Sequence, residues 1–474
     1  MKHIIRTIGI FTLFVLTMSC EDKKTKQKVD MAITNAQVIH LETGTLENQD
    51  IFISDGKIQA ILSAGTENAY EPDTLIDASG KFVLPGFWDN HIHLRGGDSL
   101  IDNNKNFLKL FIANGITTVR DAGGDLTPSV IQWKKQIASE DLVGPTIYTS
   151  GPKIDGLNAT WAGSLEVETE EDVKNALDSL QELQVDFVKL YDSRISGENY
   201  LNAIKETQKR GMTVSGHMPF TVTLKETVDA GMDAIEHLYY IMKGCASNEQ
   251  EVTERLKSGE IGFWDAMPAL MQAYSDSTAQ KTFTLLKDNN VFVVPTLHIG
   301  KTLSYLDEVD HSNDPYLTYM GQGIIQTYQG RIARSMNATE EVRNNRKELD
   351  TFFGQLAQSL DQAGVKLLAG SDSGAFNSYT YPGFSLHKEL ETMVQNGISP
   401  LDALRTSAYN GAQFLDKSNN YGSVSKGNVS DLVILDDNPL EDIRNSQRIY
   451  MVFKGTQVFS KTQLQKLLKS AIMD

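Results

Sequence analysis

The chain has 474 residues, 40% of them hydrophobic and 22% charged, which is the composition of a globular protein and excludes a disordered or collagen-like chain. Asp and Glu (61) outnumber Lys and Arg (44), and the formal net charge of -17 would repel phosphate backbones, so nucleic acid is excluded as a partner. Two cysteines cannot build a disulfide scaffold.

Residues 1–19 have the pattern of a secretory signal peptide: Lys2 and Arg6 precede the apolar run 8–18, which is too short to span a bilayer comfortably. The stretch LTMSC at 16–20 resembles a bacterial lipobox, which implies that Cys20 is lipidated and that residues 20–30 form a polar tether. We therefore expect an exported, membrane-anchored bacterial lipoprotein on the periplasmic or cell-surface face. A plain secreted protein and a short membrane anchor are the alternatives.

Both ends of the mature chain are rich in alternating strand patterns. Residues 31–81 include the run 50–58, whose Asp55-Gly56 is a hairpin signal. Residues 420–462 show the same strand pattern at 431–435 and 450–459. The simplest packing places both ends in one small β-sandwich domain.

Residues 82–416 alternate short apolar strands with helical segments. We predict eight strands, at 82–93, 117–121, 146–150, 186–191, 213–217, 234–238, 291–298 and 366–372, with helices such as 164–183, 196–210 and 341–362 between them. This order predicts an α/β fold, a (β/α)8 TIM barrel, with the β-sandwich at its side. The long segments 240–287 and 299–343, after strands six and seven, are expected to build or cover the active site.

Five of the nine histidines end predicted barrel strands, and the carboxyl ends of those strands form the functional face of such a barrel. They are His91, His93, His217, His237 and His298. His91 and His93 are two residues apart and therefore face the same side of their strand, where both can bind one ion. Asp372 ends strand eight, which lies beside strand one in a closed barrel, so its carboxylate can reach the same ion.

Lys189 lies in the apolar strand 185–191, where a buried cation is costly. It could be a neutral amine, a salt-bridged partner, or an amine that has reacted with carbon dioxide to give a carbamate able to bridge two metals. In the last case His217 and His237 would hold a second ion.

The segment 83–93 (VLPGFWDNHIH) resembles the opening of the metal-dependent amidohydrolase superfamily, and the tail segments 427–435 and 438–443 resemble its return to the β-sandwich. The series His91, His93, Lys189, His217, His237 and Asp372 resembles its binuclear subtype with a carboxylated lysine, in the imidazolonepropionase-like and prolidase-like (Xaa-Pro dipeptidase-like) branch.

The resemblance implies two zinc ions bridged by carboxylated Lys189 and sharing a hydroxide. It implies hydrolysis of amide, peptide or cyclic amide bonds in a small molecule or peptide, with Asp372 as general acid and base. The turn 191–194 departs from the Gly-rich turn of carboxypeptidase-like relatives, which speaks against a dipeptide substrate.

Several other residues are candidate substrate contacts. Tyr191, Tyr239 and Tyr240 follow metal-bearing strands and could stabilise an oxyanion, and His298 could hydrogen-bond the substrate. Arg120 could bind a carboxylate, although an internal ion pair with Asp121 is an alternative.

Two other functions stay open. One is a one-metal cyclic-amide hydrolase or deaminase in which Lys189 is merely buried, and the other is a surface lipoprotein that uses the barrel only to bind a ligand. A glycoside hydrolase is disfavoured because such enzymes work with two carboxylates. The sequence leaves the oligomeric state open, a homo-oligomer included.

Overall fold

The computed structural model describes residues 26–473, so the predicted signal peptide and Cys20 lie outside the described residues and lipidation stays a prediction. Within residues 26–473 no helix has both the length and the apolar character needed to cross a membrane.

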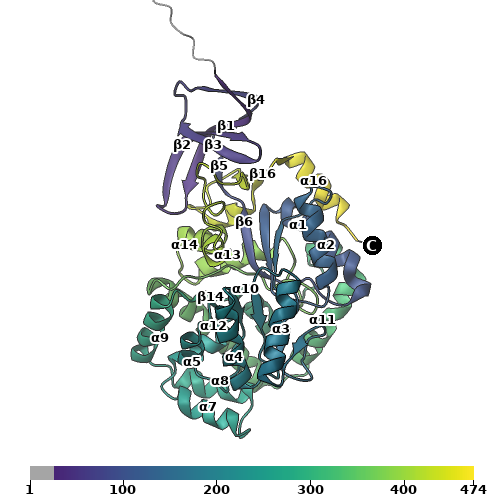
Figure 1. Cartoon of the computed structure of the whole chain (residues 1–474), viewed down its shortest axis with the longest axis vertical. Helices are drawn as coiled ribbons and strands as arrows, with labels where there is room; N and C mark the ends of the chain where they lie inside the picture. Colours follow the sequence, from purple (N-terminus) through teal and green to yellow (C-terminus); the bar gives the residue numbers. More distant parts are fainter. Residues whose placement is uncertain (1–25, 474) are drawn as a thin grey trace, which may run out of the picture.

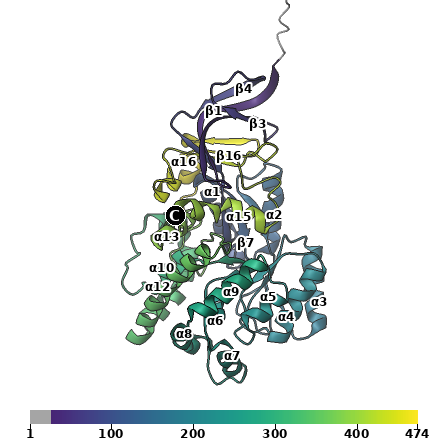
Figure 2. The same ribbon diagram turned by 90° about the vertical axis from the view of Figure 1, so that its left-hand side faces the viewer.

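Strands from both ends of the chain share one eight-stranded sheet, which lies at one end of the molecule in two perpendicular views (Figures 1 and 2). Its strands are β1 (Gln27–His40), β2 (Thr45–Ser54), β3 (Lys57–Ser63), β4 (Tyr70–Asp77), β5 (Phe82–Pro85), β15 (Leu432–Leu435), β16 (Ile449–Lys454) and β17 (Gln457–Ser460). The N-terminal and C-terminal strands meet where β5 pairs antiparallel with β15, and β5 also pairs parallel with β1. The two ends of the sequence therefore fold together.

The middle of the chain forms a parallel barrel with a helix or helices after each strand. The barrel strands are β6 (Phe87–Ile92), β7 (Ile116–Asp121), β8 (Thr146–Thr149), β11 (Val188–Leu190), β12 (Val214–Gly216), β13 (Ala234–Glu236) and β14 (Phe292–Val294). Two short strands, β9 (Ile154–Asp155) and β10 (Leu165–Glu166), extend the sheet beside β11. The predicted fold class, a TIM barrel with a flanking β-sandwich, is confirmed.

Residues 366–373 complete the barrel as its eighth strand, although they form isolated bridges rather than a continuous strand. On one side the Leu368 N–H donates to Val293 O (2.8 Å), and on the other the Asp372 N–H donates to His91 O (2.7 Å). These bonds place Asp372 beside the end of β6.

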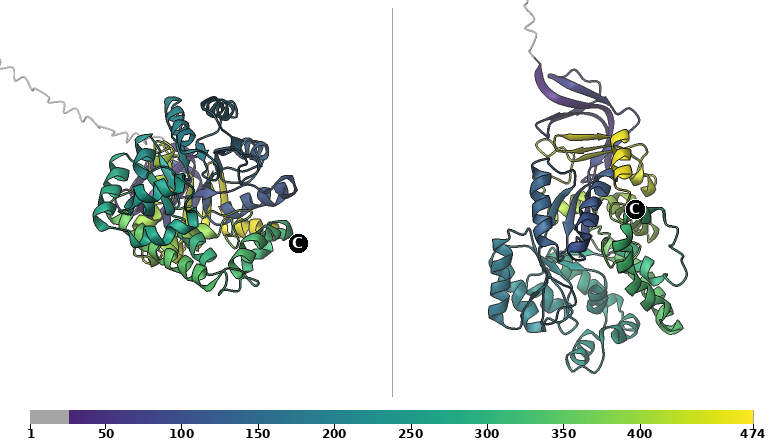
Figure 3. Two further views of the ribbon diagram at one scale, coloured as in Figure 1. Left: turned by 90° about the horizontal axis from the view of Figure 1, so that it is seen from below. Right: turned by 90° about the vertical axis from the view of Figure 1, so that its right-hand side faces the viewer.

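Helices surround the barrel, as the view from below shows (Figure 3). They are α1 (Ile101–Ala113), α2 (Thr127–Ala138), α3 (Glu170–Glu182), α4 (Gly197–Lys209), α5 (Leu224–Asp229), α6 (Tyr239–Cys245), α7 (Glu249–Lys257), α8 (Phe263–Gln272), α9 (Asp276–Asp288), α10 (Leu297–Ser304), α11 (Gly321–Met336), α12 (Glu340–Gln362), α13 (Ser385–Gln395), α14 (Pro400–Arg405), α15 (Ala408–Phe414) and α16 (Lys461–Ser470). The long predicted insertions after strands six and seven fold as α6–α9 and α10–α12.

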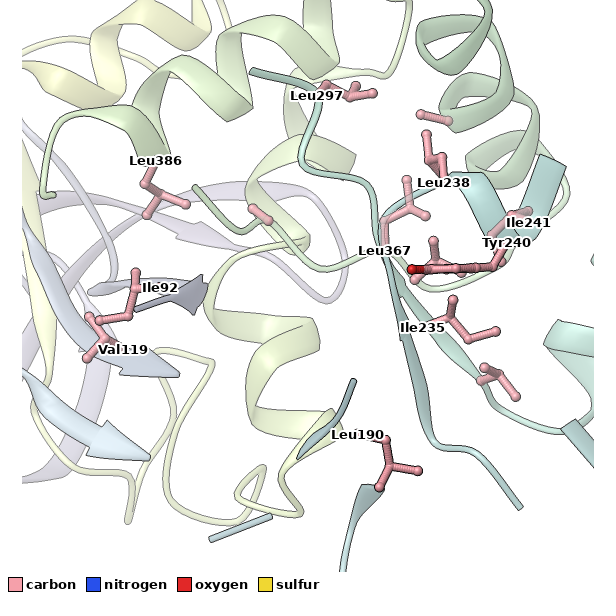
Figure 4. Close-up of a cluster of buried hydrophobic side chains, with 14 of the residues drawn as sticks. Ile92, Val119, Leu190, Ile235, Leu238, Tyr240, Ile241, Leu297, Leu367 and Leu386 are labelled. Carbon is pink, nitrogen blue, oxygen red and sulfur yellow. The ribbon is translucent and has the colours of Figure 1, made fainter. Parts of the chain in front are cut away.

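Strand residues alternate between two cores. Val188, Leu190 and Ile235 belong to the large cluster between barrel and helices, part of which Figure 4 shows, with Leu297 of α10 and Leu386 of α13. Phe187 and Ala234 belong instead to a smaller cluster in the barrel interior. Because neighbours on a strand face opposite sides, Lys189 and Glu236 share the interior face.

Two strand predictions are corrected. The predicted strand 82–93 is two strands, because the backbone changes partners at Gly86: Gly86 N–H donates to Asp431 O of the sandwich, and Phe87 N–H donates to Gly115 O of the barrel. The predicted strand 291–298 ends at Val294, because Thr296 adopts a left-handed backbone conformation (φ 50°) and α10 begins at Leu297.

The junction at Gly86 predicts a stability effect. A Cβ atom there would overlap the side chain of Thr117, which is fully buried, so we expect Gly86→Ala to lower the free energy of unfolding by about 1–3 kcal/mol. Urea denaturation measures it. The matched control is Gly330→Ala in α11, where a Cβ meets no atom within 4 Å and a gain of up to about 1 kcal/mol is expected. Equal effects of the two changes would contradict the steric explanation.

Candidate metal centre

Three ligand atoms meet at the end of β6 and of the eighth strand. His91 Nε2 lies 3.3 Å from His93 Nε2, and Asp372 Oδ1 lies 3.6 Å and 3.2 Å from these two nitrogens. In the part of the chain that the structure describes, this is the one group of three or more His, Cys, Asp or Glu ligand atoms within 4.8 Å of one another. All three residues are buried. Two imidazoles and a carboxylate are a donor set suited to zinc and related divalent metals.

A second pair of histidines lies directly beside this group. His217, after β12, and His237, after β13, place their Nε2 atoms 3.1 Å apart. The ring of His237 is 5.2 Å from that of His91, measured between centroids. The four predicted histidine ligands and Asp372 therefore converge on one spot.

Each of the four rings uses Nδ1 for a hydrogen bond to the protein, which leaves Nε2 directed at its neighbours. The partners are Glu236 Oε2 for His91 (2.7 Å), Gly123 O for His93 (2.9 Å), Asp192 Oδ1 for His217 (3.2 Å) and Thr296 Oγ1 for His237 (2.7 Å). The Thr296 hydroxyl donates to Pro295 O, so it accepts from His237. Such bonds at one nitrogen fix the tautomer and orient the other nitrogen toward a metal.

Burial sets the protonation state of these groups. Desolvation lowers the pKa of all four imidazoles, and it does so strongly for His93, His217 and His237. Burial alone would raise the pKa of Asp372, but the nearby His91 and His93 hold it well below its usual range. Neutral imidazoles beside an ionised carboxylate are the forms that bind metal ions.

Lys189 reaches the same region from β11. Its Nζ lies 3.5 Å from Glu236 Oε1 without hydrogen-bond geometry, and no acceptor among the described residues bonds this buried amine. Burial lowers the pKa of Lys189 to about 8. A buried polar group without a hydrogen-bond partner is rare in folded proteins, which marks this amine as a candidate functional group.

Three residues of the site hold the backbone in the left-handed region, where side chains other than glycine are uncommon. They are His237 (φ 68°), Thr296 (φ 50°) and Asp372 (φ 52°). Residues in such conformations persist only where the surrounding structure imposes them, and they gather at functional sites.

A cavity of about 570 Å³ opens in front of these ligands. Its walls come from the barrel-strand ends and from α6, α8 and α10–α12, so the segments after strands six and seven line the site as expected. Tyr191 and Tyr240 line it. The Tyr240 hydroxyl donates to Asp192 Oδ2 (2.7 Å), whereas the Tyr191 ring packs at a tilt of 40° against the His217 ring, with centroids 4.3 Å apart.

Two predicted substrate contacts are corrected. Arg120 is 1% exposed, does not line the cavity, and pairs with Glu236 Oε1 (2.9 Å) rather than with Asp121, because its strand position faces the barrel interior beneath the ligands. His298 lies in α10 instead of ending a strand, and it does not line the cavity. Its backbone N–H donates to the buried carboxylate of Glu389.

The sequence interpretation missed the residues that orient the ligands. Glu236 binds His91 and Arg120, Asp192 binds His217, and Asn377 donates to Asp372 Oδ1 (2.7 Å). Glu236 and Asp192 each lie beside a predicted site residue in the sequence, and a carboxylate in an apolar strand was a usable signal for Glu236. Nothing local marked Asn377.

Comparison with known proteins identifies the family. The amidohydrolase family matches residues 82–458, most of the chain and both parts of the fold. The chain belongs to this family, whose members are hydrolases that act on carbon–nitrogen bonds.

Solved structures share the whole fold at low sequence identity. A bottromycin amidohydrolase is 20% identical with a TM-score of 0.72, covering 94% of this chain and 91% of that one. A Xaa-Pro dipeptidase with bound methionine is 18% identical with a TM-score of 0.68, covering 91% and 99%. The A. niger ochratoxinase is 17% identical with a TM-score of 0.66, covering 92% and 97%.

Curated relatives match only a short segment. The adenine deaminase of Halalkalibacterium halodurans is 36% identical over 95 residues, and that of Listeria monocytogenes is 33% identical over 94 residues. These matches cover 20% of this chain, and the chain spans about 15% of the length of these relatives.

The buried pair of Arg120 and Glu236 predicts a stability effect that is independent of any metal. Arg120→Met leaves the Glu236 carboxylate without its guanidinium partner, and we expect the free energy of unfolding to fall by about 3–5 kcal/mol. Urea denaturation of the metal-free protein tests this. Arg444→Met, which breaks an exposed pair with Asp442, is the control and should change little. An Arg120→Met protein as stable as that control would contradict the role of the pair.

Proposed function

We propose that this chain is a metal-dependent hydrolase of carbon–nitrogen bonds in amides, peptides or cyclic amides. The observation that carries the proposal is the convergence of His91, His93 and Asp372 with the His217–His237 pair at the mouth of the barrel. Membership in the amidohydrolase family supports the bond type.

The residues present fit a metal centre. His91, His93 and Asp372 would hold one ion, and His217 and His237 would hold a second, with carboxylated Lys189 as the shared ligand. The buried amine of Lys189, which has no hydrogen-bond acceptor within residues 26–473 and a pKa that burial lowers to about 8, supports this last role because carbon dioxide reacts with neutral amines. Zinc, when bound, would lower the pKa of a coordinated water toward about 7 and polarise the substrate carbonyl.

Asp372 is the proposed general base and acid. Its carboxylate is ionised, borders the cavity, and is held by the Asn377 amide, so it can accept the proton of the attacking water and deliver it to the leaving nitrogen. Tyr191 is better placed than Tyr240 to stabilise the oxyanion. Burial raises its pKa to about 12, which keeps the phenol a donor, whereas the Tyr240 hydroxyl already binds Asp192.

One observation favours the second candidate, a one-metal cyclic-amide hydrolase or deaminase. Glu236 lies 3.5 Å from Lys189, so the lysine could stay a cation paired with this carboxylate instead of becoming an anionic carbamate. The short matches to adenine deaminases agree with such a reaction. A protein that only binds a small molecule would have little use for a complete set of metal-binding side chains.

Metal analysis separates the two candidates. Protein purified with zinc and bicarbonate should contain two ions per chain if Lys189 is carboxylated, and Lys189→Ala should reduce this to one. Elemental analysis gives the count, and Lys243→Ala, which removes another buried lysine, is the control that should keep both ions. A chelator should abolish hydrolysis and zinc should restore it. One ion in the unchanged protein would favour the one-metal candidate.

Replacement of Asp372 tests the proton transfer. We expect Asp372→Asn to retain the fold and to lose at least about a hundredfold in kcat, the lower range for general acid–base catalysis. Hydrolysis of N-acyl amino acids and cyclic amides by the zinc-loaded protein measures the change. Asp442→Asn, at an exposed position, is the matched control. Turnover of Asp372→Asn near that of the unchanged protein would show that the role is misassigned.

A further inference from the structure

Two of the four arginines that line the cavity share one hydrogen-bond acceptor beside Asp372. Arg95, which follows β6, and Arg331, in α11, both line the cavity, and neither forms an ion pair with a carboxylate among residues 26–473. Both guanidinium groups donate instead to a single neutral acceptor, Asn377 Oδ1, at 3.2 Å and 2.8 Å. Arg95 is only 4% exposed, and an unpaired buried cation is unusual in a chain with a net charge of -17.

These guanidinium groups keep donors free for a ligand. A guanidinium has five N–H donors. Arg95 uses two of them, one from Nε to Ala375 O and one from Nη2 to Asn377 Oδ1. Arg331 uses one, from Nη2 to Asn377 Oδ1. The Arg95 guanidinium lies 3.9 Å from the centre of the Trp161 ring, which holds its plane in place. Two fixed guanidinium groups with unused edges are suited to a carboxylate.

The arginine pair lies next to the reacting centre. Asn377 accepts from both arginines and also donates to Asp372 Oδ1 (2.7 Å) and to the Asp372 carbonyl oxygen. One amide side chain therefore separates the two cations from the proposed general acid. In an N-acyl amino acid the carboxylate carbon is two bonds from the scissile nitrogen. A carboxylate bound by these arginines would therefore keep the scissile bond near Asp372.

Aromatic side chains gather on the wall formed by α6, α8 and α12, beside Arg346 and Asp350 of α12. Tyr239 packs against Phe263 and Phe353, with ring centroids 5.5 Å and 5.0 Å apart, and Phe263 packs against Trp264 at 5.1 Å. All four aromatic residues line the cavity, and Trp264 is 60% exposed. A bulky apolar group would cover this wall and remove the exposed indole from water.

We propose that the substrate is an N-acyl amino acid with a bulky apolar acyl group, bound through its carboxylate by Arg95 and Arg331 and through its acyl group by the wall around Trp264. The cavity of about 570 Å³ is in the range that holds drug-sized ligands. Water supplies its oxygen to the acyl carbon and a proton to the nitrogen as the amide bond breaks, so the products are a carboxylic acid and a free amino acid. The inference rests on the proposed function and specifies its substrate class.

Matched probes test both halves of the substrate. The probes are N-phenylacetyl-alanine, N-phenylacetyl-proline and N-phenylacetyl-leucine. Each is compared with the N-phenylacetyl amino alcohol in which a hydroxymethyl group replaces the carboxylate, and with the N-acetyl derivative of the same amino acid. Release of the acyl acid by zinc-loaded protein is followed by chromatography. We expect kcat/KM to be about ten- to a hundredfold higher for the acids than for the alcohols, as for hydrogen bonds to charged groups. The phenylacetyl compounds should exceed the acetyl compounds by about tenfold or more.

Two variants assign these preferences to residues. Arg331→Met should lower kcat/KM for the acids by at least about tenfold more than for the alcohols, and Trp264→Ala should remove the advantage of phenylacetyl over acetyl. Arg444→Met, an exposed arginine outside the cavity lining, is the control for the lost charge. Equal hydrolysis of acids and alcohols, or equal losses for both in Arg331→Met, would overturn the proposal.

Calorimetric titration distinguishes this proposal from the proposed function if none of the probes is hydrolysed. N-phenylacetyl-alanine that binds at least about tenfold more tightly than its alcohol, with the difference lost in Arg331→Met, would support the substrate class while contradicting the hydrolase. Equal binding of the acid and the alcohol would overturn the substrate class.

Discussion

The site depends on closure of the barrel between its first and eighth strands. Asp372 N–H donates to His91 O, and His93 N–H donates to Ser373 O, so the two strand ends are held together. These bonds bring a carboxylate from position 372 within 3.2 Å of an imidazole from position 93. The left-handed backbone at Asp372 turns its side chain toward the histidines. Without this pairing Asp372 would not lie beside His91 and His93.

Beneath the ligands, charged side chains balance one another inside the barrel. Glu236 accepts from His91 and from Arg120 and lies near Lys189. Burial would raise the pKa of this carboxylate if the Arg120 guanidinium did not hold it low. Breaking such a buried pair leaves an uncompensated charge. The same carboxylate therefore stabilises the barrel interior and orients a ligand, which couples the fold to the site.

Around the mouth of the barrel, the helices and the residues that precede them orient the ligands and line the cavity. The Thr296 hydroxyl, at the start of α10, fixes the tautomer of His237, and the Glu389 carboxylate of α13 accepts the backbone N–H groups of Leu297 and His298. Arg331 of α11 and Trp264 of α8 both line the cavity. The proposed catalytic groups thus follow the barrel strands, whereas several of the proposed substrate contacts come from helices.

From its pattern alone, the sequence determined the barrel, the joining of both chain ends and the meeting of His91, His93, His217, His237 and Asp372, because strand periodicity and residue chemistry are local properties. The role of Lys189 as a shared metal ligand stays a prediction. Only the tertiary structure decided that Arg120 is an interior partner of Glu236, that His298 lies in helix α10 and does not line the cavity, and that Asn377 connects Asp372 with Arg95 and Arg331. These roles depend on contacts between residues up to 282 positions apart, and no local pattern specifies which distant side chain will lie opposite.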